Sequence, residues 1–300
     1  MIKSKLFIIL FILIFVINIF SYEIFFSGEE LLKFLKDKIL QSQSLRLVSF
    51  SLDDTISNEL AKVNSEIFLE YEGGYSGNSN LSINYDKNID GYLHEKFILF
   101  DDESVLFGTG NFTESGLLTD FNVFIYTEDQ KIVDIFLQEV SNFKKGKFGK
   151  NKNPIYVVLK NTDLNHVKIV TGPSNQITSS ILREVKKAKK SIKVFSYSFT
   201  DPYFVEVLER MSSKGISVEI LSDDWNKLYD SPIKFLTGID VKYNDNIHAK
   251  TIIIDDEIVI LGSYNLTYRA REKNDEIITI INNESVANIL RQKFDLLYVE

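Results

Sequence analysis

Hydrophobic positions along this chain follow two alternating periods. From residue 29, EELLKFLKDKIL places five apolar residues on one stripe at helical spacing, namely Leu31, Leu32, Phe34, Leu35 and Ile39. SLRLVSFSL then reads as a strand. The switch recurs with a short helix opened by Asp53, strands in SEIFLEY and FNVFIY, and a helix in DQKIVDIFLQEV. Helices and strands that alternate in this way predict an α/β fold.

The second part of the chain repeats the first in order. Residues 177–190 read as a helix, SIKVFSYSF as a strand, DPYFVEVLERM as a helix and GISVEIL as a strand. VSFSLDD near residue 48 and FSYSFTD near residue 195 also correspond in place. We therefore predict two repeated halves, residues 22–143 and 155–300, that pack together as an internal pseudo-dimer.

Two further segments lie outside these halves. Residues 144–154, KKGKFGKNKNP, are polar, basic and bounded by Gly and Pro, which predicts a solvated linker. Residues 1–21 carry two lysines and then an apolar run that only Asn18 interrupts, which is typical of an export segment. Because a spanning helix needs about 20 apolar residues and this run is shorter, a signal peptide and an N-terminal membrane anchor both stay open. We expect a protein that is exported to the periplasm or the outside, or held in the membrane by this segment.

Composition excludes several classes of site. The 300 residues are 44% hydrophobic, which is enough for one large or two medium cores. The net charge of −8 argues against broad nonspecific binding to a polyanion. The chain has no cysteine, so disulfides, zinc–thiolate sites and cysteine nucleophiles are excluded.

One motif with candidate chemistry occurs in each half. Its members in the second half are His248, Lys250, Asp255, Gly262, Ser263 and Asn265, and those at the same offsets in the first half are His94, Lys96, Asp101, Gly108, Thr109 and Asn111. A single His-x-Lys is more often an ordinary strand feature than a catalytic one. The chain has only three histidines, however, and two of them at matched positions fit coincidence poorly.

The spacing within each motif has a chemical meaning. Alternate residues of a strand share a face, so each histidine, a candidate nucleophile or base, points the same way as the lysine two residues later. The hydroxyl and amide side chains that follow can hydrogen-bond a phosphate, and the candidate substrate-binding residues are Thr109, Asn111, Ser263 and Asn265. No metal-ligand cluster accompanies the motifs, so we expect neither a metal nor another cofactor.

Asp101 and Asp255 complete the two motifs. We count both among the catalytic candidates with the histidines and lysines. Their parity is opposite to that of the histidines, and each begins a DDE turn, which indicates a role in the turn rather than as a second base.

The motif resembles the signature of the phospholipase D superfamily: His-x-Lys, four residues, Asp, six residues, then Gly, Ser or Thr, any residue and Asn. The resemblance covers nearly everything after the export segment, and the first copy differs only by Thr109 for Ser. It implies two α/β halves, each a mixed β-sheet flanked by helices, with a single active site across their interface.

The resemblance also implies a metal-independent, two-step phosphodiester exchange. His94 would attack phosphorus to give a phosphohistidine, supported by Glu276 of the opposite half, and His248 would transfer protons. Lys96 and Lys250 would hold the non-bridging oxygens.

The acidic position of the family is filled in one half only. Glu276 occupies it in the second half, whereas the matching residue of the first half is Asn122. A carboxylate stabilises a charged imidazole, but an amide can only orient it. We therefore expect the two histidines to titrate differently.

Three functions fit these features. The first is a phospholipase D-type phosphodiesterase, a monomer at a membrane surface that hydrolyses or transfers phospholipid phosphodiester bonds. The second is an exported endonuclease that acts on nucleic acid, and the third is a non-catalytic surface protein that retains the fold. The export segment, the acidic balance and the two-motif chain favour the first.

Overall fold

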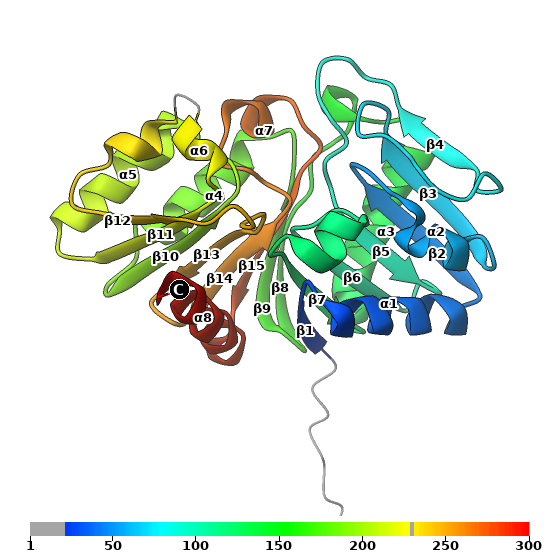
Figure 1. The fold of residues 1–300 in the computed structure, drawn as a ribbon, viewed down its shortest axis with the longest axis horizontal. Coiled ribbons are helices and arrows are strands. Elements are labelled where there is room, and N and C mark those ends of the chain that lie inside the picture. The colour runs from blue at the N-terminus through cyan, green and yellow to red at the C-terminus, as the bar shows by residue number, and fades with distance from the viewer. Residues whose placement is uncertain (1–21, 229–230, 300) are drawn as a thin grey trace, which may run out of the picture.

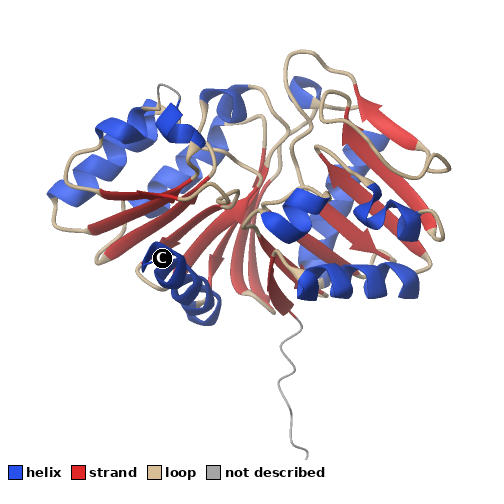
Figure 2. Cartoon of the chain, viewed as in Figure 1, coloured by secondary structure: helices blue, strands red, loops and turns tan. Residues whose placement is uncertain are grey.

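Two β-sheets form the frame of the protein. The computed structural model describes residues 22–228 and 231–299. Strands run through the middle of the molecule and helices cover them, with the N-terminal half (blue to green) beside the C-terminal half (yellow to red) in Figures 1 and 2. The expected export segment, residues 1–21, lies outside the described residues. Among the residues that are described, no helix is both long and apolar enough to cross a membrane.

The first sheet has seven strands and is mixed. Their order is β1 (Tyr22–Phe26), β7 (Val123–Thr127), β6 (Ser104–Gly108), β5 (Phe97–Phe100), β2 (Ser44–Ser49), β3 (Asn64–Glu70) and β4 (Ile83–Asp86). β2, β3 and β4 pair in parallel, and the other neighbours pair antiparallel. The accompanying helices are α1 (Glu29–Gln41), α2 (Asp54–Leu60), the π-helical turn η1 (Ser115–Thr119) and α3 (Gln130–Lys144).

The second sheet repeats this order and adds one edge strand, β8. It runs β12 (Asp240–Tyr243), β11 (Ser217–Ser222), β10 (Ser191–Ser196), β13 (Lys250–Ile254), β14 (Ile258–Gly262), β15 (Ile277–Asn282), β9 (Asn165–Thr171) and β8 (Tyr156–Thr162). Its helices are α4 (Asn175–Val185), α5 (Pro202–Ser213), α6 (Trp225–Leu228), η3 (Pro232–Phe235), α7 (Tyr268–Glu272) and α8 (Glu284–Val299). The predicted fold, two repeated halves with mixed sheets flanked by helices, is confirmed.

The two halves share a hydrophobic core. Buried side chains from β5 and α3 of the first half and from β13 and α8 of the second belong to one continuous cluster, which includes Phe97, Phe136, Ile253 and Phe294. Separate clusters lie under α1 and α2 and under α4 and α5. Because both faces of each sheet are covered, β5 is an unbroken apolar run after Lys96, and β13 is apolar from residue 252 to its end. This core fixes how the motif strands of one half face those of the other.

Most of the connection between the halves is exposed to solvent, as its composition predicts, but Gly149 and Lys152 are buried. After α3 the chain forms a short 3₁₀ turn, η2 (Gly149–Asn151), and the next side chain, Lys152, is fully buried. A lysine is seldom fully buried unless its charge is compensated, and local composition carries no sign of carboxylate partners. The boundaries of the halves themselves stay a prediction.

The motif aspartates belong to hairpin turns and not to the catalytic groups with which we counted them. Asp101 and Asp255 follow β5 and β13, with φ of 54° and 56°, a left-handed conformation that Asp tolerates. The Asp101 carboxylate accepts the backbone N–H groups of residues 43 and 44, and that of Asp255 accepts those of residues 189, 190 and 191. Seven residues of extended chain, about 23 Å, separate each aspartate from its histidine. Both carboxylates therefore anchor the turn to the neighbouring strand.

This role can be tested within one turn. Asp255→Ala should lower the free energy of unfolding by about 1–3 kcal/mol more than Asp256→Ala, because only Asp255 leaves backbone donors without an acceptor. Asp256 has nearly the same left-handed φ, 58°, and contacts only the Arg291 guanidinium, at 3.5 Å. Urea unfolding of both variants measures the difference, and equal losses would contradict the anchoring role.

Candidate active site between the two halves

Backbone bridges between the halves create the site. The His94 N–H donates to the Asp275 carbonyl at 2.9 Å, and the His248 N–H donates to the Phe121 carbonyl at 3.1 Å. Each bridge places a histidine beside the residue that follows the accepting carbonyl in the opposite half. This residue is Glu276 for His94 and Asn122 for His248. The site thus has approximate two-fold symmetry, and neither half completes it alone.

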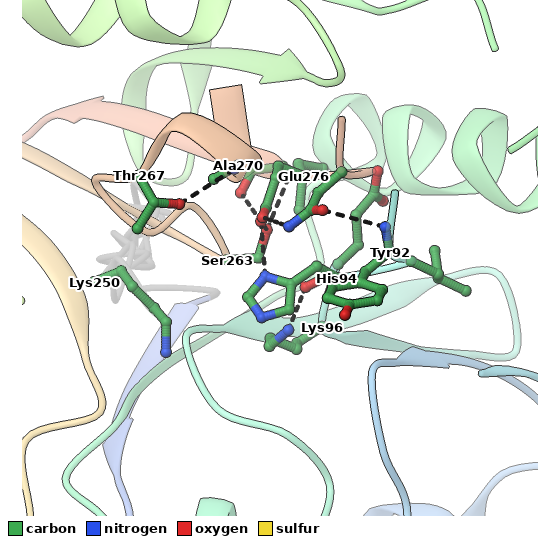
Figure 3. A network of polar contacts seen from close by, with 12 residues as sticks. Tyr92, His94, Lys96, Lys250, Ser263, Thr267, Ala270 and Glu276 are labelled. Carbon is green, nitrogen blue, oxygen red and sulfur yellow. Dashed lines mark hydrogen bonds and ion pairs between the residues drawn. The ribbon is translucent and has the colours of Figure 1, made fainter. Parts of the chain in front are cut away.

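The first histidine pairs with a carboxylate. His94 Nδ1 lies 3.0 Å from Glu276 Oε2, and Glu276 is fully buried (Figure 3). Two side chains of the second half orient this carboxylate: Ser263 Oγ donates to Oε2, and Asn274 Nδ2 donates to Oε1 at 3.0 Å. Burial opposes ionisation of Glu276, but His94 and Lys96 outweigh it, so the pKa of this carboxyl lies below its ordinary value. Glu276 is therefore an anion that holds the Nδ1 proton of His94.

The second histidine pairs with an amide in the same geometry. His248 Nδ1 lies 2.9 Å from Asn122 Oδ1, which also accepts the Thr109 hydroxyl at 2.9 Å. Asn122 Nδ2 donates to the Gly116 carbonyl at 3.1 Å, which fixes the side-chain amide with its oxygen toward the histidine. Both histidines thus carry their proton on Nδ1, and their Nε2 atoms are left for chemistry.

The two motif lysines are buried and lie beside the two histidines, with which they form one cluster. Lys96 Nζ donates to the His94 carbonyl. Lys250 Nζ lies 3.1 Å from both ring nitrogens of His248 and 3.3 Å from the Thr109 carbonyl. Figure 3 shows Lys96 and Lys250 on the side of the His94 ring that faces away from Glu276. Two histidines and two lysines therefore surround one point at the interface.

The buried position of the two histidines and the two lysines disfavours a positive charge on each of them. Burial lowers the pKa of His94 to about 4 and that of Lys96 to about 7, although Glu276 pulls both upward. Burial and Lys250 hold the pKa of His248 well below its ordinary value, and burial and Lys96 do the same for the pKa of Lys250. An anionic group at this point stabilises the charged form of each. The arrangement is suited to bind a phosphate and to let its arrival recruit protons.

The hydroxyl groups of Thr109 and Ser263 bind other protein side chains. Thr109 and Ser263 are fully buried, and each holds the residue that orients the histidine of the other half, Asn122 or Glu276. Our expectation that they contact substrate is corrected on this point. Asn122 and Glu276 immediately precede β7 and β15, the strands that bring them beside the two hydroxyls. The spacing within each motif does not predict this contact.

The motif amides keep an unused polar atom. The Oδ1 atoms of Asn111 and Asn265 are buried and accept no hydrogen bond from the part of the chain that the structure describes. Asn111 also lines a surface groove of about 430 Å³ that includes Ser51, Gly74 and Ser76. A role in substrate binding stays our proposal for these two residues.

Two aromatic residues beside the histidines escaped the sequence analysis. Phe50 lies edge-on to the His94 ring at 5.6 Å between centroids, and Tyr197 lies 4.5 Å from the His248 ring and under Lys250. A signal for them existed, since both hold the third place of the matched segments VSFSLDD and FSYSFTD. Trp225 stacks on Tyr197, with 6.4 Å between the ring centroids, so this aromatic contact lies within the second half.

The duplicated fold and the crossed histidine pairs define a member of the phospholipase D superfamily. More particularly, the chain belongs to the family described as "Cardiolipin synthase, PLD-like domain", whose model matches residues 17–144 and 181–298. The first matched segment covers the strands and helices of the first sheet, and the second covers those of the second sheet from within α4 onward, without β8 and β9.

Similar proteins cover parts of this chain or share its fold. A mitochondrial cardiolipin hydrolase from Canis lupus familiaris is 27% identical over 128 residues, which cover 41% of this chain and 50% of that protein. A cardiolipin synthase from Staphylococcus aureus is 30% identical over 138 residues, or 41% of this chain and 28% of the synthase. The crystal structure of phosphatidylserine synthase from Haemophilus influenzae covers 91% of this chain and 84% of its own, with a TM-score of 0.67 at 12% identity, and shows the common fold.

The unequal partners of the two histidines predict unequal titration. Asn122→Asp should raise the pKa of His248, because it places a negative charge where the amide now accepts a hydrogen bond. Glu276→Gln should lower the pKa of His94 further, since this histidine loses the charge that opposes its desolvation. Proton NMR titration of the ring Cε1–H signals measures both, and His166, which is exposed, serves as the internal reference. An unmoved His248 signal in the Asn122 variant would show that this amide is not its partner in solution.

Proposed function

We propose that this chain is a metal-independent phosphodiesterase of the phospholipase D type, which hydrolyses or transfers phospholipid phosphodiester bonds through a phosphohistidine. The observation that carries the proposal is the crossed pairing of His94 with Glu276 and of His248 with Asn122, since it directs two Nε2 atoms and two lysines at one point. Family membership supports phosphodiester chemistry of this kind.

In the first step His94 Nε2 attacks phosphorus and the bond to the leaving oxygen breaks. His248, protonated once the anionic substrate is bound, gives its Nε2 proton to the leaving alcohol. Lys96 and Lys250 hold the non-bridging oxygens and stabilise the charge that develops on them. The products of this step are the free alcohol, a phosphoryl group on His94 and a neutral His248.

In the second step His248 Nε2 takes a proton from water, or from an acceptor alcohol, whose oxygen attacks phosphorus. The phosphorus–nitrogen bond breaks and His94 is restored. The broken symmetry supports this division of roles. Phosphorylated His94 carries a positive charge that Glu276 compensates, whereas the neutral Asn122 leaves His248 ready to release a proton.

The substrate assignment rests on chemistry and on relatives. Two relatives are named for cardiolipin, which is a phospholipid. Because the chain spans half or less of their length, their substrates support a phospholipid here only by analogy. The apolar export segment would bring the enzyme to a membrane surface, and we propose an exported or membrane-anchored monomer.

A substrate panel tests the proposal. The purified protein, with EDTA present, should cleave at least one of phosphatidylcholine, phosphatidylglycerol and cardiolipin in vesicles. His94→Ala and His248→Ala should each lose at least about a thousandfold in kcat, because both steps need both groups. His166→Ala is the matched control and should keep full activity, since this third histidine is exposed and its ring hydrogen-bonds to the neighbouring Asn165, away from the two motifs.

Each other outcome has a definite meaning. Cleavage of single-stranded DNA without cleavage of lipid would replace the proposal by the endonuclease, and inactivity on every substrate would favour the non-catalytic surface protein. Substantial activity in either histidine variant would contradict the shared site. Loss of activity in EDTA that a divalent ion restores would contradict metal independence.

A further inference from the structure

A buried ion cluster lies directly behind one of the two histidines. Lys152 Nζ contacts three carboxylates, at 2.7 Å from Glu95 Oε1, 2.5 Å from Glu139 Oε2 and 2.9 Å from Asp275 Oδ1. The four side chains are 0–1% exposed. Glu95 and Glu139 belong to the first half and Asp275 to the second, so Lys152 joins the halves. None of these four groups takes part in the mechanism above.

The cluster is continuous with the catalytic backbone. Glu95 lies between His94 and Lys96, and Asp275 immediately precedes Glu276. The Asp275 carbonyl accepts the His94 N–H at 2.9 Å, and the Asp275 N–H donates to the carbonyl of residue 92 at 2.8 Å. Asp275 Oδ2 also accepts the backbone N–H of residue 149, at 2.7 Å, from the same connecting segment as Lys152.

Among the described residues, the opposite side of the pseudo-dimer has no such cluster. The residues at the places of Glu95 and Asp275 are Ala249, which belongs to the apolar core that the halves share, and Phe121, which packs against that core. The bridge at His248 is therefore held by apolar packing and the bridge at His94 by charge. The asymmetry of the cluster matches that of Glu276 and Asn122.

Lys152 holds these carboxylates together against their mutual repulsion. Burial lowers the pKa of Lys152, but its three partners outweigh burial and raise it well above the ordinary value. Burial and Glu139 raise the pKa of Glu95, while Lys152 opposes them. An ion cluster of this kind has little tolerance for the loss of one partner, because the charges left behind stay buried.

We propose that Lys152 is a positioning residue, which holds the His94 strand to the Glu276 strand through Glu95 and Asp275 and so keeps His94 and Glu276 in register. The proposal rests on the proposed function for the step that it affects, which is attack by His94. The hydrogen bond between His94 and Glu276 is observable without any turnover.

NMR of the three histidines tests the proposal directly. In protein labelled with ¹⁵N-histidine, the His94 Nδ1–H should give a low-field proton signal from its bond to Glu276, identified by its loss in Glu276→Gln. Lys152→Met should move this signal upfield or broaden it, while the His248 signal stays in place. With a nitrophenyl phosphodiester, kcat should fall about 10–100-fold with little change in KM, since a misplaced nucleophile still shares its pocket with bound substrate.

Lys168→Met is the matched control. Lys168 forms a comparable, largely buried pair with Glu184 at 3.0 Å, but this pair lies in the second half between β9 and α4. This variant should leave both histidine signals and kcat unchanged, even where its stability falls. Unchanged His94 signal and kcat in folded Lys152→Met would overturn the proposal.

Milder variants keep the test decisive where Lys152→Met does not fold. Asp275→Asn keeps the shape of the side chain and weakens the tie to Lys152, and should disturb the His94 signal. Glu139→Gln removes a partner that flanks no catalytic residue, and should not. Equal effects of these two variants would overturn the positioning role. If wild type turns over no substrate, the NMR comparison still decides on Lys152, so the two proposals fail separately.

Discussion

The structure depends on a crossed contact: each motif histidine is oriented by the half that does not contain it. Two backbone bridges, from His94 to residue 275 and from His248 to residue 121, make this crossing possible. They are short and lie at the edge of the shared core, so they depend on the packing of β5 and α3 against β13 and α8. Separation of the halves would leave each histidine with its lysine but without its Nδ1 partner. Duplication thus gives this fold one site, because both histidines meet their Nδ1 partners at the same interface between the halves.

The proposed mechanism requires that the symmetry be incomplete. A nucleophilic histidine would carry a positive charge while phosphorylated, and a proton-transferring histidine would have to lose its charge easily. The difference between Glu276 and Asn122, each held by a buried hydroxyl, fits these two needs. The buried cluster around Lys152 extends the same asymmetry beyond the residues that touch the imidazole rings.

Much of this arrangement could be predicted from the sequence because it is local or repeated. Period and repetition gave two α/β halves, and strand parity correctly separated the histidines and lysines from Asp101 and Asp255, which we nevertheless counted as catalytic. Strand parity predicts which face of the sheet a side chain lies on, but not which residue it contacts. The hydrogen bonds of Thr109 to Asn122 and of Ser263 to Glu276 were therefore not predicted.

Long-range burial was the hardest feature to predict. Lys152 lies in a polar, basic segment, and Glu95 is 57 residues away along the chain. Nothing near Lys152 in the sequence indicates the contact. Phe50 and Tyr197, by contrast, were detectable in principle, because the repeat places them at equivalent positions.

The location of a covalent phosphate tests the account most directly. His248→Ala, given a nitrophenyl phosphodiester whose leaving group needs no protonation, should complete the first step and stall before water attacks. Mass spectrometry of a digest kept away from acid should then find the phosphoryl group on His94, and His94→Ala should accumulate none. A phosphoryl group on His248 in the His94→Ala variant would reverse the roles, and its absence from both variants would contradict the covalent mechanism.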